Sequence, residues 1–442
     1  MNRAVKDGSV GADRAGGTRE LLSQTKSAFY TVSTLGLELR NRALEALAHQ
    51  IEEDQNLWLE ANQKDLDAAA GEVSDSVFAR LKLNESKIRQ IIQGVRDIAA
   101  LPDPIGRVLD RTRLDNGLIL EKITVPLGVI AMVFESRPDV LPQILSLALK
   151  SGNAVVLKGG RETLGSNHAF MKILKKVEDQ IDRLPSGWAQ LIDTREDFHE
   201  LLRYPEYVDL VIPRGSNELV QLIMNSTQIP VLGHAEGICH VYVHEQADIE
   251  KAIRVALDSK TQYTGVCNAT ETLLVDEKIA ARFLPAFETA AEAKNVQLIG
   301  CSETREILTG IKPASEEDWS TEYLDLRLSV RVVDGLGQAV EHINKYGSHH
   351  TDSIITEDAS AREAFIAKVD SATVISNAST RFADGFRFGL GAEVGISTLK
   401  THARGPVGLE GLTIYKYVLR GEGQIVEDYV GDNARPFLHD KL

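Results

Sequence analysis

The sequence predicts an α/β protein with two doubly wound units, each built on a parallel sheet. Short apolar segments alternate with helical patterns between residues 128 and 232, and the alternation starts again after Gly237. The chain has 442 residues, which is too long for a single hydrophobic core. Its apolar fraction of 43% and charged fraction of 26% are those of a globular protein. We therefore expect two compact domains and a smaller accessory element.

The N-terminal part of the chain divides into two segments. Residues 1–18 are rich in Gly, Asp, Arg and Ala and show no period, so we expect a disordered extension. Residues 19–106 have helical periodicity, with Leu44, Leu47 and Ile51 on one face. We assign these helices to the first domain, together with residues 125–236.

A hairpin interrupts this domain. Residues 107–124 form two short strand patterns around Asn116-Gly117, a pair that tolerates the positive φ angles of a tight turn. Residues 411–435 contain another strand pattern at 412–419. From the residues alone we expect a hairpin at the first segment and a strand at 412–419.

Buried strands of the two domains are predicted from their continuous apolar character. In the first domain helices begin near Leu141, Gly165, Glu196 and Asn217, and the strands lie at 128–134, 154–157, 189–192, 208–212 and 230–232. In the second domain, residues 237–410, the strands lie at 238–243, 272–275, 296–299, 329–333, 353–356 and 373–376.

Charge and cysteine usage exclude several classes of function. The net charge is −15, from 49 basic and 64 acidic residues, which argues against a nucleic-acid-binding protein. The longest apolar run, 129–134, is too short to cross a membrane. Cys239, Cys267 and Cys301 are too widely spaced for a zinc cluster or a disulfide framework. We see no secretory signal and expect a reducing, cytoplasmic compartment.

Cys267 is the strongest candidate nucleophile. It lies in a Thr264-Gly-Val-Cys-Asn268 loop just before a predicted strand. Gly265 allows a substrate to approach, and Asn268 offers amides that can hold an oxyanion. The alternative from the residues alone is a buried cysteine that acts as a small apolar side chain.

Further motifs occur in order around this cysteine. They are Glu135-Ser-Arg-Pro-Asp139, Lys158-Gly-Gly160, Ile212-Pro-Arg-Gly215, Asn377-Ala-Ser-Thr-Arg-Phe382, Phe388-Gly-Leu-Gly-Ala-Glu-Val394 and His402-Ala-Arg-Gly-Pro406. This set resembles the motifs of the gamma-glutamyl phosphate reductases, a family of the aldehyde dehydrogenase superfamily. The resemblance runs from about residue 21 to 430, and it implies an aldehyde dehydrogenase-like fold. Thr264-Gly-Val266 departs from the Pro-Ser-Thr or Pro-Ala-Ala that family members often carry before Cys-Asn.

Two segments are candidate cofactor sites because each follows a buried strand and precedes a helix. A lysine at a strand end can meet ribose or phosphate oxygens, although an ordinary turn is equally consistent with the local sequence. An adjacent arginine can read a 2′-phosphate, which favours NADP over NAD. The amides of the other segment can bind pyrophosphate. The candidate residues are Lys158, Gly159, Gly160 and Arg161 in the first segment, and Arg214, Gly215 and Ser216 in the second.

Two polar loops are candidates for the substrate. The resemblance places Arg137 near the cysteine, where an arginine fork suits a phosphate. The alternative is a surface ion pair with Glu135 or Asp139. The second loop carries Asn377, Ser379, Thr380 and Arg381, the last of which can pair with an α-carboxylate.

No metal site is predicted. His240 and His244 lie too far apart along a strand to share one ion. His349, His350 and His402 are loop residues without ligand spacing, and we interpret them as structural or surface residues.

The resemblance implies the NADPH-dependent reduction of L-glutamyl 5-phosphate to L-glutamate 5-semialdehyde, by way of a thioester on Cys267. The surrounding pocket should lower the pKa of the thiol. An ordinary aldehyde dehydrogenase would need a glutamate to activate water, and in the corresponding loop, 231–237, Glu236 is the only carboxylate. A non-catalytic paralogue is the other alternative, and Cys267, Arg137 and Lys158 argue against it.

The resemblance also implies partners. The arm formed by 107–124 and 411–435 pairs with a neighbouring subunit in the superfamily, so we expect a homo-oligomer, a dimer or tetramer. The chain shows no kinase segment, so a separate glutamate 5-kinase is expected to supply the acyl phosphate.

Overall fold

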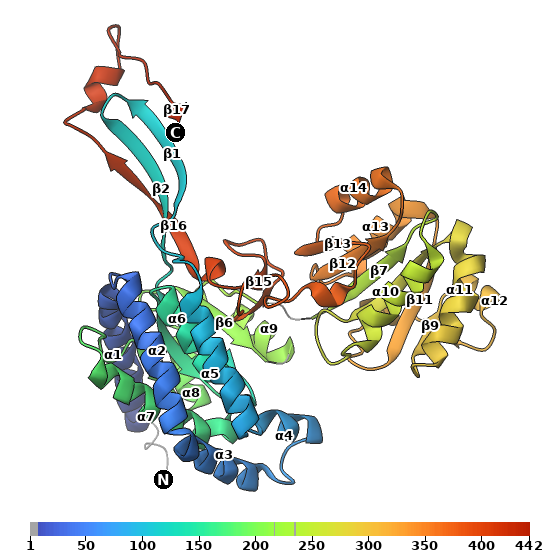
Figure 1. Cartoon of the computed structure of the whole chain (residues 1–442), viewed down its shortest axis with the longest axis horizontal. Coiled ribbons are helices and arrows are strands. Elements are labelled where there is room, and N and C mark those ends of the chain that lie inside the picture. Colours follow the sequence, from blue (N-terminus) through green and yellow to red (C-terminus); the bar gives the residue numbers. More distant parts are fainter. Residues whose placement is uncertain (1–7, 216, 234–235) are drawn as a thin grey trace, which may run out of the picture. The chain divides into compact units, whose positions relative to one another are not determined.

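A computed structural model describes residues 8–215, 217–233 and 236–442 and divides the chain into two compact units. Unit 1 comprises residues 1–215, 222–232 and 408–442, and unit 2 comprises residues 216–221 and 233–407. Each unit has its own parallel sheet, as the sequence predicts (Figure 1).

The parallel sheet of unit 1 has the strand order β5-β4-β3-β6. The strands are β3 (Val129–Phe134), β4 (Ala154–Lys158), β5 (Ala189–Leu191) and β6 (Leu210–Arg214). The helices that connect them are α6 (Val140–Lys150), α7 (Leu164–Gln180), α8 (Arg195–Leu201) and, after β6, α9 (Asn217–Ser226). The predicted strand at 230–232 is wrong as a full strand, because only Val231 bridges Val211 in parallel.

Helices before this sheet cover it and bury the predicted apolar face. Leu44, Leu47 and Ile51 are buried on α2. The side chain of Asn84 caps α5 by accepting a hydrogen bond from the Lys87 amide at 2.8 Å. The helices are α1 (Gly8–Val32), α2 (Leu37–Glu53), α3 (Gln55–Ala69), α4 (Asp75–Leu81) and α5 (Glu85–Ala100).

The expected disorder over residues 1–18 is wrong for residues 8–18, which form the first turns of α1. Residues 1–7 lie outside the described parts of the chain. Thr18 is buried, and its hydroxyl donates to Asp197 at 3.5 Å. Once the later turns of a helix are packed, adding further turns avoids the cost of nucleation, which is why a glycine-containing segment can remain helical.

A separate antiparallel sheet in unit 1 has the order β16-β2-β1-β17. The hairpin and the returning strand correspond to the predicted segments at 107–124 and 412–419. The sequence does not predict β17, a two-residue strand at the last residues of the chain that pairs with β1. The strands are β1 (Val108–Asp115), β2 (Leu118–Pro126), β16 (Thr413–Arg420) and β17 (Asp440–Lys441), with the turns η4 (Glu410–Leu412) and η5 (Val426–Tyr429).

Unit 2 holds a seven-stranded parallel sheet of order β10-β9-β11-β8-β7-β12-β13. In this order β8 is the central strand, and β7 lies between β8 and β12. The strands are β7 (Cys239–Val243), β8 (Thr270–Asp276), β9 (Gln297–Gly300), β10 (Lys312–Pro313), β11 (Arg327–Val333), β12 (Thr351–Ile355) and β13 (Thr373–Ser376). A two-stranded sheet pairs β14 (Gly395–Ser397) with β15 (Gly405–Val407).

Helices cover both faces of this sheet (Figure 1). Val241, Leu273 and Phe283 belong to a core between the sheet and α10–α11, whereas Tyr242 and Phe365 belong to a second core beneath α13–α14. The helices are α10 (Ile249–Thr261), α11 (Glu277–Glu292), α12 (Ser302–Ile307), α13 (Gly335–Tyr346) and α14 (Ala359–Lys368), with η2 (Glu317–Ser320).

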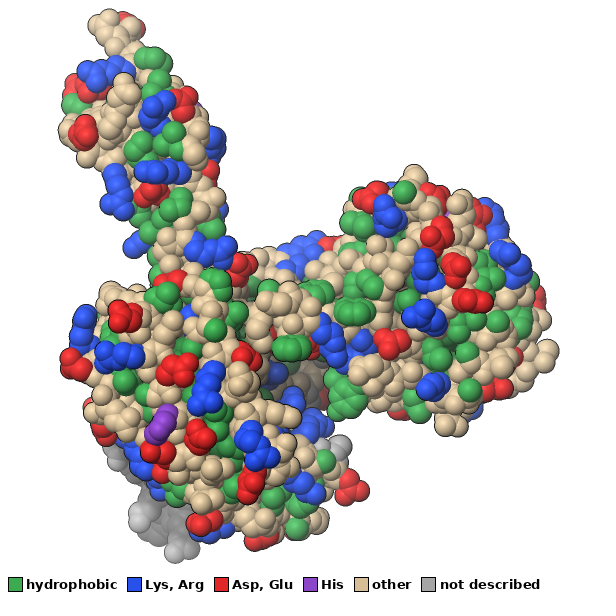
Figure 2. Space-filling view, viewed as in Figure 1, with side chains coloured by type: hydrophobic (Ala, Val, Ile, Leu, Met, Phe, Trp, Pro, Cys, Tyr) green, Lys and Arg blue, Asp and Glu red, His purple; other side chains and the backbone are tan. Residues whose placement is uncertain are grey.

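Acidic and basic side chains are interspersed on the face shown in Figure 2, so the net charge of −15 does not gather there into one patch. Within the described parts of the chain, every helix is too short or too polar to span a lipid bilayer.

Candidate active site

Cys267 lies in a turn at the amino edge of the unit 2 sheet, between the end of α10 and the start of β8. Gly237 packs directly against it. A Cβ at position 237 would come within 2.2 Å of the Cys267 carbonyl oxygen and 2.3 Å of its Cα. The backbone at Gly237 therefore fixes one side of the loop, and only glycine fits there. A Cβ at Gly265, two residues before the nucleophile, would meet nothing within 4 Å.

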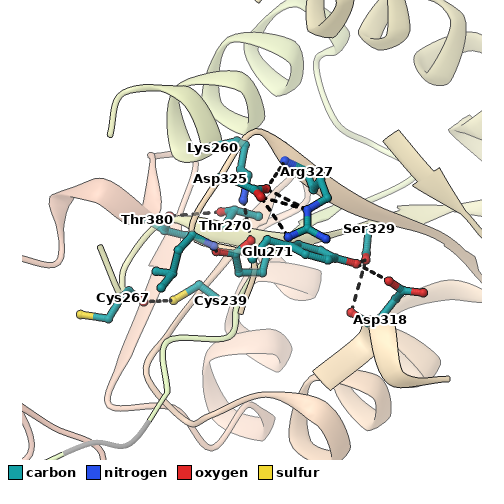
Figure 3. A network of polar contacts seen from close by, with 12 residues as sticks. Cys239, Lys260, Cys267, Thr270, Glu271, Asp318, Asp325, Arg327, Ser329 and Thr380 are labelled. Atoms are coloured by element: carbon teal, nitrogen blue, oxygen red, sulfur yellow. Dashed lines mark hydrogen bonds and ion pairs between the residues drawn. The ribbon is translucent and has the colours of Figure 1, made fainter. Parts of the chain in front are cut away.

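A histidine contacts the nucleophile. Nε2 of His350 lies 3.2 Å from Sγ of Cys267. His350 is buried and immediately precedes β12, the strand next to β7. His350 is therefore not a surface residue, and its ring contacts the sulfur of the predicted nucleophile. Cys239, at the start of β7, donates its thiol to the Cys267 carbonyl at 3.2 Å (Figure 3).

Asn268 is held by the loop that contains η3 (Thr380–Phe382). Its side-chain amide donates to the Ala383 carbonyl at 2.8 Å, and its own carbonyl accepts from the Thr380 hydroxyl at 2.7 Å. Thr270 lies 3.1 Å from the same hydroxyl. One N–H of the Asn268 side chain is thus engaged with the backbone, so this side chain helps to position the loop.

A buried ion pair joins the two ends of the nucleophile loop. Lys260, at the end of α10, pairs with Glu271 on β8 at 2.5 Å, and both side chains are fully buried (Figure 3). Burial raises the pKa of Glu271 to about 7 and lowers that of Lys260, and the pairing opposes both shifts. Removing one partner would leave a buried charge, which typically costs about 3–5 kcal/mol. The pair therefore fixes where residues 262–269 leave the helix and enter the strand.

The expectation that the pocket lowers the pKa of the Cys267 thiol is wrong, because the surrounding protein groups raise it. Burial raises the pKa of Cys267 to about 12, and the carboxylates of Glu322 and Glu393 raise it further. The thiol's own backbone amide and the guanidinium of Arg381 oppose the shift. The residue as a whole is half-buried, and desolvation is the largest cause of the shift. These surroundings favour the thiol over the thiolate at neutral pH.

Arg381 faces the nucleophile from η3. The residue is buried, with 8% of its surface exposed. Its Nε donates to the side-chain oxygen of Gln262 at 2.9 Å. Burial and the neighbouring Arg387 lower its pKa, while Asp384 opposes them. A buried cation beside a thiol suits an anionic part of a substrate.

The other predicted substrate residues have structural contacts. The side chain of Asn377 accepts from the Thr356 amide and donates to the Thr356 carbonyl, both at 2.9 Å. Its φ of 53° is one that asparagine tolerates. Ser379 caps η3 by accepting from the Arg381 amide at 3.2 Å. Asn377, Ser379 and Thr380 therefore shape the loop that carries Arg381.

The predicted cofactor residues lie at or just after the carboxyl ends of two strands of the unit 1 sheet. Lys158 ends β4 and Arg214 ends β6, with β3 between them. Lys158 is buried and donates to the Gly159 carbonyl at 2.5 Å, and burial lowers its pKa. Arg161 is exposed at the start of η1 (Arg161–Thr163). These cations share the carboxyl edge of one parallel sheet, a donor set that fits a phosphorylated dinucleotide.

A contact between two loops shapes this edge. The Ser136 amide and hydroxyl donate to the Glu162 carboxylate at 2.8 and 2.7 Å. A Cβ on Gly160 would come within 2.0 Å of the same carboxylate, and one on Gly159 within 2.1 Å of the Asn167 amide. Both glycines are therefore required by packing within the protein.

Arg137 is exposed in the loop after β3, in unit 1, whereas Cys267 belongs to unit 2. Asp139, one of its two predicted ion-pair partners, pairs with Lys87 at 3.2 Å. Gly215 is exposed beyond β6, and Ser216 lies outside the described residues.

The remaining histidines have partners within unit 2. His240 is fully buried and bonds Asp352 at 2.8 Å through Nδ1, and His244 lies 2.9 Å from the Thr356 hydroxyl. Within the described parts of the chain, no three His, Cys, Asp or Glu side chains come together as a metal site. All three cysteines are free thiols.

Comparisons with known proteins relate the chain to one family. A model described as the aldehyde dehydrogenase family matches residues 8–303. Gamma-glutamyl phosphate reductase of Acetivibrio thermocellus is 51% identical, over 96% of this chain and 98% of the relative. The reductase of Methanosarcina barkeri is 51% identical over 95% and 96%. A crystal structure of gamma-glutamyl phosphate reductase from Thermotoga maritima has a TM-score of 0.90 at 40% identity, covering 92% of this chain and 99% of that one.

The packing at Gly237 yields a prediction. Gly237→Ala should displace the nucleophile loop, because its methyl group would meet the backbone of Cys267, which cannot rotate away. We expect alkylation of Cys267 at pH 10 to slow by about tenfold or more, and the melting temperature to fall by several degrees. Gly265→Ala is the matched control and should change neither, since open space surrounds that position. Normal alkylation in Gly237→Ala would refute the packing argument.

The raised thiol pKa yields a second prediction. With a pKa of about 12, roughly one Cys267 in 10⁵ is a thiolate at pH 7. Alkylation by iodoacetamide, followed on the Cys267 peptide by mass spectrometry, should therefore rise about tenfold per pH unit from 7 to 10. Glu393→Gln removes a facing carboxylate and should speed alkylation at pH 7 severalfold. Glu316→Gln, on an exposed carboxylate that does not act on Cys267, is the control. A plateau below pH 9 would contradict the raised pKa.

Proposed function

Because this chain belongs to the aldehyde dehydrogenase family and, within it, to the gamma-glutamyl phosphate reductases, we propose that it reduces L-glutamyl 5-phosphate to L-glutamate 5-semialdehyde and phosphate. This reaction is the second step of proline synthesis. The observation that supports it most strongly is a cysteine on a clamped loop with a histidine 3.2 Å from its sulfur, in a chain 51% identical to named reductases.

Three residues of unit 2 have separate roles in the proposed acyl transfer. Cys267 attacks the acyl carbon and displaces phosphate, which leaves a thioester on its sulfur. The second N–H of the Asn268 side chain and the amides of its turn are the donors for the developing oxyanion. Arg381 supplies positive charge to an anionic group of the substrate, such as its α-carboxylate.

We propose NADPH as the reductant, held by Lys158, Arg161 and Arg214 at the carboxyl edge of the unit 1 sheet. When bound, the dihydronicotinamide supplies a hydride to the acyl carbon. The position of Lys158 at the end of β4 supports a contact with ribose or phosphate oxygens, and the exposure of Arg161 supports a contact with a 2′-phosphate. Arg137, whose fork can bind two oxygens, is proposed to bind the departing phosphate.

Phosphate dependence tests the proposed reaction directly. Run from glutamate semialdehyde and NADP⁺, the enzyme should turn over steadily only with phosphate, because the sequence at 231–237 lacks the motif glutamate that activates water in ordinary aldehyde dehydrogenases. Without phosphate, NADPH should form in a burst roughly equal to the enzyme present. Cys267→Ala should abolish both, and Arg137→Ala should raise the KM for phosphate by about tenfold or more.

Glu236 is the control for the alternative of an ordinary aldehyde dehydrogenase. Its carboxylate accepts from the Asn217 amide at 2.6 Å. Glu236→Gln should leave phosphate-dependent turnover nearly unchanged. Sustained turnover in phosphate-free buffer, lost in Glu236→Gln, would instead make Glu236 a hydrolytic base and overturn the proposed reaction.

Cofactor preference tests the role of Arg161. Arg161→Ala should weaken NADPH binding by about tenfold and NADH binding little, because only NADPH carries the 2′-phosphate. Dissociation constants from fluorescence titration give the comparison. Arg203→Ala removes an equally exposed arginine, which pairs with Glu200, and should alter neither constant. Equal weakening of both cofactors by Arg161→Ala would exclude it as the 2′-phosphate reader.

A further inference from the structure

The tautomer of His350 decides the direction of its contact with Cys267. In a neutral imidazole one nitrogen carries a proton and the other accepts. Nδ1 of His350 lies 2.9 Å from the Thr351 hydroxyl, while Nε2 lies 3.2 Å from Sγ of Cys267. When Nδ1 donates to Thr351, the lone pair of Nε2 faces the thiol. Cys239 lies farther from Nδ1, at 3.8 Å, and its thiol donates to the Cys267 carbonyl.

The other ionisable groups around the thiol are less suited to accept its proton. Glu322 and Glu393 raise the pKa of Cys267 by repelling a thiolate, and each carboxylate already accepts a backbone amide, from Gly237 and Gly385. Arg381 is a cation. Cys239 is fully buried, and burial and the charge of Asp352 hold its pKa well above the ordinary value. His350 is the neutral acceptor in direct contact with the sulfur.

We propose that His350 is the general base that takes the Cys267 proton during acyl transfer, with Thr351 holding its tautomer. The S–H bond breaks as the C–S bond forms, and the proton passes to Nε2. The C–O bond to the leaving group then breaks, and the departing phosphate takes the proton from the imidazolium. His350 returns to its neutral form, and no oxidant or reductant takes part in this half of the reaction. The proposal deepens the proposed function, since it rests on Cys267 as its nucleophile.

The test uses 4-nitrophenyl acetate as the acyl donor, which carries neither a glutamyl group nor phosphate. The burst of nitrophenolate, corrected with Cys267→Ala, measures acylation of the thiol in the full-length protein. In the wild type the burst rate should rise with pH until His350 is neutral and then level off. In His350→Gln it should be about 10²–10⁴-fold slower at pH 7 and climb about tenfold per unit toward pH 10, where thiolate forms without a base.

Two measurements separate this role from a structural one. Iodoacetamide should alkylate Cys267 in His350→Gln at pH 10 as fast as in the wild type, because the loop keeps its place. Thr351→Val keeps the shape of the side chain and should slow acylation about tenfold at pH 7 with little effect at pH 10. The control is His349→Asn, at the residue next to His350. It removes a ring bonded to the Asp370 carbonyl and should behave as wild type.

Each outcome decides the proposal. The proposal would be overturned if the burst rate of His350→Gln at pH 7 equalled that of the wild type, or if the rate fell by the same factor at every pH. Slow alkylation of Cys267 in His350→Gln at pH 10, or the absence of a burst in the wild type, would also overturn it. If His350→Gln does not fold, the pH-dependent loss in Thr351→Val carries the test, and its absence refutes the proposal. A normal burst together with no turnover of glutamate semialdehyde would refute the proposed substrate and leave the role of His350 intact.

Discussion

The backbone of the nucleophile loop is held by groups from several neighbouring elements, and the chemistry of unit 2 depends on this clamp. Gly237 packs against the Cα of Cys267, the thiol of Cys239 donates to its carbonyl, and the Thr380 hydroxyl donates to the carbonyl of Asn268. At both ends of the loop, the buried Lys260–Glu271 pair joins helix to strand. A nucleophile must be held within a few tenths of an ångström of its working geometry, and here the backbone itself is fixed.

Much of the fold follows from the sequence, because buried parallel strands are continuous apolar runs and most of them were predicted within two residues. Cys267 likewise stands out as the predicted nucleophile from its loop and neighbouring motifs. The contact of His350 with Cys267 does not follow from the sequence, for a physical reason. His350 immediately precedes β12, Cys267 lies three residues before the start of β8, and Cys239 begins β7. These three residues meet only because β8, β7 and β12 are neighbours, and strand order is not written in local periodicity.

Other differences arise where a side chain has a partner distant in sequence. The polar motif around Asn377 predicts a substrate ligand. In the structure its side-chain amide accepts from the Thr356 N–H and donates to the Thr356 carbonyl. The pocket was expected to favour a thiolate, but burial and two carboxylates favour the thiol. A sequence motif identifies which groups gather at a site, whereas the balance of desolvation and charge depends on their distances.

The two units use opposite edges of their parallel sheets. In unit 1 the cations follow the carboxyl ends of β3, β4 and β6, while in unit 2 Cys267 and His350 precede the amino ends of β8 and β12. The carboxyl ends of β7 and β12 are therefore separated from the nucleophile by the length of a strand, about 15 Å for five residues, whereas the segment after β13 returns to the nucleophile loop. Lengthening a surface loop costs little closure entropy, roughly 0.6 kcal/mol per doubling. Chain insertions after β7 or β12 could thus accumulate during divergence, adding new surface to the protein while leaving its reacting atoms in place.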